Sequence, residues 1–327
     1  MEKKRITFKV FRFNPAVDDL PHYESYVMEV KKDALVLDIL NRIKWEFDGS
    51  FTYRRSCRHG ICGSCSIRVN GKVVLSCKEN VFELTDIFGD LLVLEPQNKQ
   101  KVIKDMVIDR VDFWNKYTEV KPFLVAKYDE HPEVEARVSP DEASLMLDSD
   151  ICIQCANCYS VCPSVRVNEK YYGPAAFVKA YRFIVDTRDH NKKERIDIIN
   201  EPEKGVWDCV KCYKCAEVCP KGVNPIEKIT LLHNQVFKEG RAKNNVATRH
   251  AIGFKKSIQK NGFLDEGFLV RYSEGIFGTM KHLREAFDMF RRGKIKMPWN
   301  MPSKPKKMNE IKQLIKVASK IECRRKW

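Results

Sequence analysis

Two cysteine runs of the same spacing stand between Ile151 and Val223. One reads CIQCANCYSVCP and the other CVKCYKCAEVCP, so both have the form C-x2-C-x2-C-x3-C-P. Their cysteines are Cys152, Cys155, Cys158 and Cys162 in the first run, and Cys209, Cys212, Cys215 and Cys219 in the second. This spacing is typical of [4Fe–4S] sites in which three cysteines of one run and the fourth of the other surround one cube. The repeat therefore predicts two cubic clusters.

Two other uses of such cysteines are a disulfide framework and zinc sites. Four cysteines fall within eleven residues, twice, which suits ligation better than pairing across a fold. No secretory signal peptide opens the sequence, so we expect reduced thiols. Zinc sites usually separate two cysteine pairs by a longer insert. Iron–sulfur clusters are therefore the preferred interpretation.

A third cysteine group has a different spacing and lies in RRSCRHGICGSCSIRVNGKVVLSC. Its members are Cys57, Cys62, Cys65 and Cys77. The pattern C-x4-C-x2-C…C is that of plant-type [2Fe–2S] sites. Gly60 and Gly63 allow the backbone to curl close to the sulfurs. His59 is expected to be solvated, because four cysteines satisfy such a cluster and histidine ligation of the Rieske type needs two histidines.

The sequence around this loop indicates a β-grasp fold. Apolar and polar residues alternate in Lys4–Asn14 and in Ser25–Val30, and a helical pattern follows Asp33. The pair Asn70-Gly71 is a hairpin signal, and Leu91–Pro96 has the composition of a last strand.

These patterns predict an α+β chain with four regions. We expect a [2Fe–2S] β-grasp domain at 1–100, followed by a connecting helix and linker at 101–140. An all-α ferredoxin domain with both cysteine runs is expected at 141–240, and a basic helical extension at 241–327. Apolar spacing places the connecting helix at Lys101–Thr118.

The positive charge of the chain is concentrated in this extension. Residues 241–327 contain 22 lysines and arginines against 7 acidic residues, which accounts for the formal net charge of +15. Nucleic-acid binding is not expected, because the preceding residues are charge-balanced and carry no recognition motif. No run of about 18 apolar residues is present, so any membrane association should be peripheral or through a partner.

The extension also carries an apolar stripe at helical spacing, interleaved with basic residues. Its members are Ile276, Met280, Leu283, Phe287 and Phe290.

Over residues 1–240 the chain resembles the iron–sulfur subunit of the succinate dehydrogenase/fumarate reductase family. The resemblance rests on the cysteine loop quoted above and on CIQCANCYSVCPS, YGPAAFVKAYRFIVDTRD and EVCPKGVNP. It implies a non-catalytic electron-transfer subunit that connects an FAD-containing flavoprotein subunit with a quinone-reactive partner through three clusters. It also implies a peripheral place at the membrane through partners. The cytoplasmic face is the default, and the periplasmic face applies if a partner carries an export signal.

Cys212 departs from this family, in which most members have an apolar residue there and hold a [3Fe–4S] cluster. Its thiolate supplies the missing corner, so we expect two [4Fe–4S] clusters beside the [2Fe–2S] cluster. One cube would be bound by Cys152, Cys155, Cys158 and Cys219, and the other by Cys209, Cys212, Cys215 and Cys162. The alternative is an unligated Cys212 beside a [3Fe–4S] cluster.

Two further departures concern the partners. SVRVNEKYYGP (Ser164–Pro174) replaces the usual aromatic segment, and Val210 stands where some members have a histidine at the quinone site. FKKSIQKNGFLDEGF and FRRGKIKMP in the extension resemble small ferredoxin subunits of heterodisulfide reductases. This suggests docking to a cysteine-rich subunit with CCG motifs in place of a membrane-anchor subunit. Alternatively, the extension covers the chain's own core, or its basic helices lie on anionic lipid.

A cube in place of a three-iron cluster should lower the potential at the quinone end, because the potential depends on cluster type. We therefore expect fumarate reduction with a low-potential menaquinol. The alternative is a thiol-linked fumarate reductase or a heterodisulfide-reductase-like complex. Cys323, a lone thiol near the end of the sequence, is not expected to be a ligand.

Overall fold

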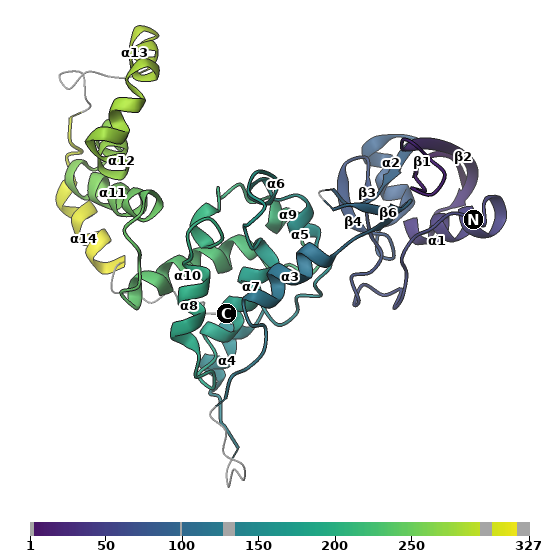
Figure 1. Cartoon of the computed structure of the whole chain (residues 1–327), viewed down its shortest axis with the longest axis horizontal. Coiled ribbons are helices and arrows are strands. Elements are labelled where there is room, and N and C mark those ends of the chain that lie inside the picture. The colour runs from purple at the N-terminus through teal and green to yellow at the C-terminus, as the bar shows by residue number, and fades with distance from the viewer. Residues whose placement is uncertain (1–2, 99, 127–134, 295–302, 319–327) are drawn as a thin grey trace. The chain divides into compact units, whose positions relative to one another are not determined.

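The structure is a computed structural model of the chain. It describes residues 3–98, 100–126, 135–294 and 303–318. The chain divides into two compact units, residues 1–238 and 239–327, and each is described by itself (Figure 1). Cys323 lies outside the described residues. No described helix is both long and apolar enough to cross a membrane.

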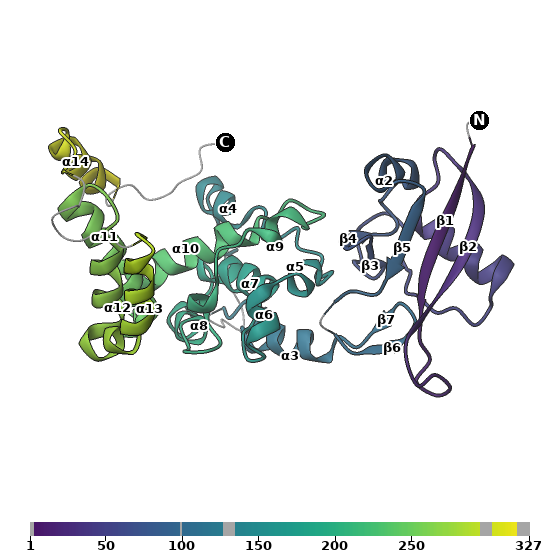
Figure 2. The same ribbon diagram turned by 90° about the horizontal axis from the view of Figure 1, so that it is seen from above.

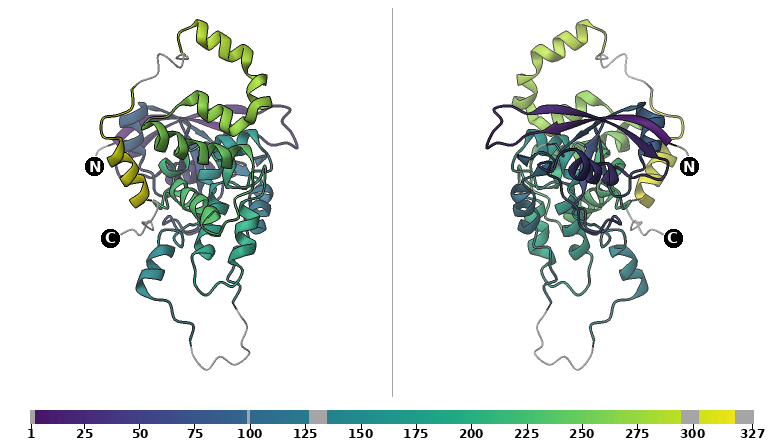
Figure 3. Two further views of the ribbon diagram at one scale, coloured as in Figure 1. Left: turned by 90° about the vertical axis from the view of Figure 1, so that its left-hand side faces the viewer. Right: turned by 90° about the vertical axis from the view of Figure 1, so that its right-hand side faces the viewer.

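The first unit begins with a five-stranded mixed sheet in the order β2-β1-β5-β3-β4. The strands are β1 (Lys3–Arg12), β2 (His22–Lys31), β3 (Ser66–Val69), β4 (Lys72–Leu75) and β5 (Leu91–Glu95). Phe8 of β1 pairs with Tyr26 of the antiparallel β2 and with Leu92 of the parallel β5. Figures 2 and 3 show the long β1–β2 pair in purple. As the alternation predicts, Ile6, Phe8 and Val10 are buried in the core.

Helices cover one face of this sheet. They are α1 (Val36–Arg42), its continuation as the π-helix η1 (Ile43–Phe47), and α2 (Val81–Phe88). Ile39 and Leu40 of α1 and Leu84 of α2 pack into the same core as the strands. The side chain of Asn80 caps α2 by accepting hydrogen bonds from the N–H groups of Phe82 and Glu83 at 2.8 and 3.2 Å.

The segment after the sheet differs from the helix expected over 101–118. Val102–Lys104 (β6) and Val107–Ile108 (β7) form a hairpin, and the helix α3 spans only Val111–Glu119. Asp105 makes the turn with a positive φ of 46°, and its carboxylate pairs with the buried Arg12 at 3.1 Å. This tertiary ion pair and the β-branched residues of both strands prevail over the apolar spacing.

The rest of the first unit is helical. Its elements are α4 (Pro140–Met146), α5 (Asn157–Ser160), α6 (Pro163–Val167), α7 (Pro174–Ile184), α8 (Lys192–Ile199), η2 (Val206–Asp208), α9 (Lys214–Glu217) and α10 (Pro225–Lys238). The central helix α7 is almost entirely buried and packs against α10 and α8.

The second unit consists of helices. They are α11 (Val246–Asn261), α12 (Glu266–Lys281), α13 (Leu283–Arg291) and α14 (Met308–Ala318). Gly253 allows α11 to approach α12, because a Cβ there would lie 2.8 Å from the ring of Tyr272. Within this unit α13 and α14 have no buried residue among those described. The expected α+β fold class is confirmed: a β-grasp sheet, a helical domain and C-terminal helices.

Candidate metal centres

The first candidate centre is the loop between η1 and β3, together with the residue that follows β4 by two positions. It contains the predicted Cys57, Cys62, Cys65 and Cys77. The loop curls around one sulfur, because the N–H groups of Ile61 and Cys62 both donate to Sγ of Cys57 at 3.3 Å. Gly60 and Gly63 have positive φ values of 71° and 67°, which a glycine adopts without strain. His59 is exposed.

The thiols of this loop differ in acidity. Burial by itself raises the pKa of Cys62, but hydrogen bonds with Ser64 and Cys57 outweigh burial and lower this pKa to about 6. Burial and the neighbouring Cys65 raise the pKa of Cys77 to about 11. The thiol of Cys62 therefore ionises readily, whereas that of Cys77 ionises only beside a cation. A bound metal ion supplies such a cation.

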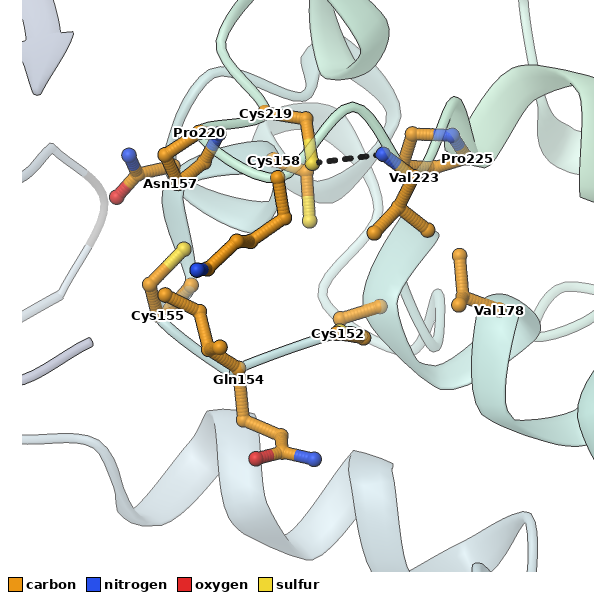
Figure 4. A pocket seen from close by; sticks show the side chains of 14 residues that line it. Cys152, Gln154, Cys155, Asn157, Cys158, Val178, Cys219, Pro220, Val223 and Pro225 are labelled. Carbon is orange, nitrogen blue, oxygen red and sulfur yellow. Dashed lines mark hydrogen bonds between the residues drawn. The ribbon is translucent and has the colours of Figure 1, made fainter. Parts of the chain in front are cut away.

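The second candidate centre is a cavity between the two cysteine runs (Figure 4). Its cysteines are Cys152, Cys155, Cys158 and Cys219, three from the first run and one from the second. The N–H of Val223 donates to Sγ of Cys219 at 3.4 Å. Burial raises the pKa of Cys155 to about 11 and that of Cys158 well above its usual value. Four thiolates can gather here only beside a positive charge, which iron supplies.

The third candidate centre is a second cavity between the two cysteine runs. Its cysteines are Cys162, Cys209, Cys212 and Cys215, one from the first run and three from the second. Burial raises the pKa of Cys162 and Cys209, and raises that of Cys215 to about 12. Cys212 differs from the other three because it is exposed.

The sequence repeat is visible as a structural repeat. The short helices α5 and α9 pack against each other, and each begins after a residue with a left-handed φ of 64°, Ala156 or Tyr213. They carry Cys158 and Cys215, the third cysteines of the two runs. The structure therefore brings together the same two sets of four cysteines that the sequence analysis assigned to the two cubes.

The twelve cysteines within the described ranges form no disulfide. Eight of them line the second and third centres, four at each cavity. A set of four thiols at one cavity fits a cubic cluster.

A buried polar junction connects the first centre with the second. Nε2 of Gln97 lies 2.6 Å from Oγ of Ser66, 2.9 Å from Oδ1 of Asn157 and 3.1 Å from the carbonyl oxygen of Cys155. Gln97, Ser66 and Asn157 are all at most 5% exposed. Gln97 thus hydrogen-bonds with groups beside both the first and the second centre. This buried network stabilises the packing of the first cysteine loop against the first cysteine run.

Sequence reasoning did not identify the residues of this junction. Gln97 is a single polar residue outside any motif, and no local pattern marks it. Its contacts with Ser66 and Asn157 reach 31 and 60 positions along the chain.

Two protein families match the chain in the regions just described. Residues 7–115 match the family described as 2Fe-2S iron-sulfur cluster binding domain. Residues 148–223 match the family described as 4Fe-4S dicluster domain. The cluster types predicted from the cysteine spacing, one [2Fe–2S] and a pair of cubic sites, agree with these families.

Curated relatives are similar over most of their length. The succinate dehydrogenase iron–sulfur subunit of Paracoccus denitrificans is 35% identical over 231 residues, covering 70% of this chain and 87% of that protein. The fumarate reductase iron–sulfur subunit of Haemophilus influenzae is 35% identical over 232 residues, covering 68% and 89%. A chain of the Mycobacterium smegmatis Sdh1 complex has the same fold, with a TM-score of 0.62 at 23% identity, covering 73% of this chain and 98% of that one. The chain therefore belongs to the iron–sulfur subunits of the succinate dehydrogenase/fumarate reductase family and is an electron-transfer subunit of such an oxidoreductase complex.

Proposed function

We propose that this subunit relays electrons between a flavoprotein with a dicarboxylate site and a quinone-reactive partner, in the direction of fumarate reduction by a low-potential menaquinol. The observation that supports this proposal is the crossed grouping of eight cysteines around two cavities, with Cys212 in the second group. A complete set of four thiols at both cavities favours two cubes.

The proposed ligand sets follow the three groups of cysteines. The [2Fe–2S] cluster is assigned to Cys57, Cys62, Cys65 and Cys77. The first [4Fe–4S] cluster is assigned to Cys152, Cys155, Cys158 and Cys219. The second [4Fe–4S] cluster is assigned to Cys209, Cys212, Cys215 and Cys162.

When bound, the clusters supply one-electron redox chemistry that couples a two-electron flavin to a distant acceptor. The chain's own residues hold the thiolates and exclude water. Val178 and Val223 line the first cavity, and Ile226 and Ile229 line the second. Hydrogen bonds to sulfur, such as that from the N–H of Val223, stabilise thiolate charge and tune the potential.

The exposed side of the second cavity is the proposed exit toward the quinone-reactive partner. Cys212 is exposed, and the neighbouring Val210 and Tyr213 are 63% and 60% exposed. Large apolar side chains around an exposed ligand suit a surface that a partner subunit covers. The side chain of Val210 cannot donate a hydrogen bond to a quinone, so such a donor would have to come from another residue or from the partner.

The direction of flux rests on the cluster type at this exit. Cluster potentials span roughly −700 to +450 mV and depend on cluster type and charge. A cube at the second cavity is expected to have a lower potential than a three-iron cluster, because the potential depends on cluster type. A low cluster potential suits electron transfer from a menaquinol to fumarate better than electron transfer from succinate to a quinone.

The C-terminal helices are the proposed docking element for the quinone-reactive side. On α12 and α13, Phe277 and Phe287 are 86% and 63% exposed, on a segment with a large excess of basic residues. The proposed occupant is a cysteine-rich subunit of the CCG type, with a membrane-anchor subunit as the other candidate. The subunit would then be peripheral to the membrane through its partners, on the cytoplasmic face unless a partner carries an export signal.

A second candidate is a thiol-linked fumarate reductase or a heterodisulfide-reductase-like complex. The motifs FKKSIQKNGFLDEGF and FRRGKIKMP favour it, since they resemble small ferredoxin subunits of heterodisulfide reductases. Both candidates use the same ligand sets and differ in the donor.

Two experiments test the proposal. A stoichiometric three-iron EPR signal in the anaerobically isolated, oxidised protein would overturn the second cubic cluster. The complex isolated through a tag on this chain should also oxidise reduced viologen when fumarate is added. A cluster-loaded complex without that activity would overturn the assignment to fumarate reduction.

A further inference from the structure

One partly buried cation, Arg110, lies between the first and second candidate centres. Nη2 of Arg110 is 3.3 Å from the carbonyl oxygen of Cys155 and 3.5 Å from that of Gly63. Gly63 stands between Cys62 and Cys65 in the first cysteine loop, and Cys155 is the second cysteine of the first run. A single guanidinium therefore contacts the backbone of both cysteine loops.

Within the described part of the chain, Arg110 forms no ion pair with a carboxylate, and its buried Nε has no hydrogen-bond partner. Arg12 shows the contrast: it is more deeply buried, and it pairs with Asp105, Glu24 and Asp48. Even a partly buried cation without an acidic partner is costly unless another negative charge lies nearby.

The charged groups that act on Arg110 are the thiols of the two centres and one further cation. Burial lowers the pKa of Arg110, the thiolate form of Cys155 opposes this effect, Arg54 adds to it, and Cys62 and Cys65 oppose it. A guanidinium stays protonated in proteins, so Arg110 is a fixed positive charge. Arg54 approaches the same region, with its Nη2 3.4 Å from the carbonyl oxygen of Ile108.

We propose that Arg110 sets the reduction potentials of the [2Fe–2S] cluster and the first [4Fe–4S] cluster together, by stabilising their reduced states. Reduction adds one negative charge to a group beside the guanidinium, and a neighbouring positive charge stabilises that added charge. In the low-dielectric interior the effect is stronger than at the surface. This inference rests on the proposed ligand sets, because it requires Cys62, Cys65 and Cys155 to hold iron.

The guanidinium of Arg110 acts on both the first and the second centre. A change at position 110 should therefore move the reduction potentials of both clusters in the same direction. The third centre serves as an internal reference, since its cysteines, Cys162, Cys209, Cys212 and Cys215, line a separate cavity.

The test is a redox titration of the purified holo-subunit, with each cluster followed by its EPR signal. In Arg110→Met the equilibrium constant for reduction of the first two clusters should fall at least tenfold, a shift of about 59 mV for a one-electron couple. The third midpoint should stay unchanged. Arg110→Lys keeps the charge and should restore most of the wild-type value. Arg42→Met, on the exposed face of α1, is the matched control for loss of an arginine, and should move no midpoint.

The outcomes separate this inference from the ligand assignment. Unchanged midpoints of both clusters in Arg110→Met, or equal shifts at all three clusters, would overturn the role of Arg110. Absence of the expected cluster signals from the wild-type protein would instead overturn the ligand sets. If Arg110→Met does not assemble, Arg110→Gln removes the charge but keeps an N–H donor for the carbonyls, and the same downward shift is expected.

Discussion

The backbone of Gly63 lies directly against Cys155. A Cβ at position 63 would be 2.8 Å from both Cα and Cβ of Cys155 and 2.9 Å from the carbonyl oxygen of Ile153. These atoms belong to the backbone and to a proposed ligand, so they cannot move aside cheaply. The backbones of the first cysteine loop and the first cysteine run are therefore in direct contact, and only glycine fits at position 63.

Gly63→Ala should lower stability through this contact. Gly71 provides the control, because it also has a positive φ, of 83°, but a Cβ there would meet nothing within 4 Å. Both variants carry the strain of a positive φ, and overpacking adds about 1–3 kcal/mol at position 63 alone. Anaerobic urea unfolding of the two holo-variants measures the difference. Equal losses of stability in the two variants would mean that the close approach has no energetic consequence.

Gln97→Leu should loosen the junction between the same two regions. The change leaves Oγ of Ser66 and Oδ1 of Asn157 without the amide that lies between them, at a cost of about 1–3 kcal/mol. We expect a lower unfolding temperature for the holo-protein and faster proteolysis between the two regions. Gln313→Leu, at an exposed position of α14, is the control and should behave as the wild type. Unaltered stability of Gln97→Leu would show that the junction is replaceable.

Cys212→Ser should convert the second cubic cluster to a three-iron cluster. Three thiolates remain around that cavity, from Cys162, Cys209 and Cys215. The oxidised variant should therefore show a three-iron EPR signal that the wild type lacks, with a higher midpoint potential. Cys323→Ser, which removes the lone cysteine, should leave the spectrum unchanged. A wild-type spectrum in Cys212→Ser would mean that Cys212 is not a ligand.

His233 should make the stability of the first unit sensitive to mild acid. Its Nε2 lies 2.9 Å from the carbonyl oxygen of Val206, and its ring stacks on Trp207 at 4.4 Å. Burial lowers the pKa of His233 to about 4, against about 6.5 for an exposed histidine. The folded state disfavours the charged ring, so protonation of His233 favours unfolding. The contribution of His233 to the free energy of unfolding is therefore complete above pH 6.5 and declines as the pH falls toward 4. The expected loss at pH 5 is about 2 kcal/mol.

The measurement is anaerobic urea unfolding at pH 8 and pH 5, followed by far-UV circular dichroism. His233→Gln can still donate to Val206 but does not titrate, so its stability should depend less on pH. His59→Gln, at an exposed position, should keep the wild-type dependence. The same pH dependence in His233→Gln would assign the acid sensitivity to other groups.

The features that could be predicted from the sequence are those carried by local spacing. The alternation of Ile6, Phe8 and Val10 was enough to predict a strand with one buried face, because side chains alternate across a strand. The grouping of Cys219 with the first run was predicted from the spacing of the repeat. The strand pattern repeats over a few residues, and the cysteine spacing is that of sites in which the fourth ligand comes from the other run.

The features that could not be predicted depend on contacts between distant residues. Apolar spacing over 101–118 suggested one helix, yet Asp105 is drawn into an ion pair with Arg12 and the segment turns into a hairpin. Arg110 has no motif, and its position between two cysteine loops follows only from the packing of distant segments. Cys212 is exposed, whereas its equivalent in the first run, Cys155, is buried. This difference could not be predicted from the spacing that the two runs share.

The exchange of one cysteine between the two runs has a consequence for how the protein is made. Both cavities need cysteines from beyond η2, since Cys219 completes the first and Cys209 begins the main part of the second. During synthesis the first run is translated before these residues exist. The second cubic site cannot be filled until the chain has been translated through Cys215, and the first until it has been translated through Cys219, so loading of both is a late event. The β-grasp loop ends at Cys77 and is free to receive its iron earlier.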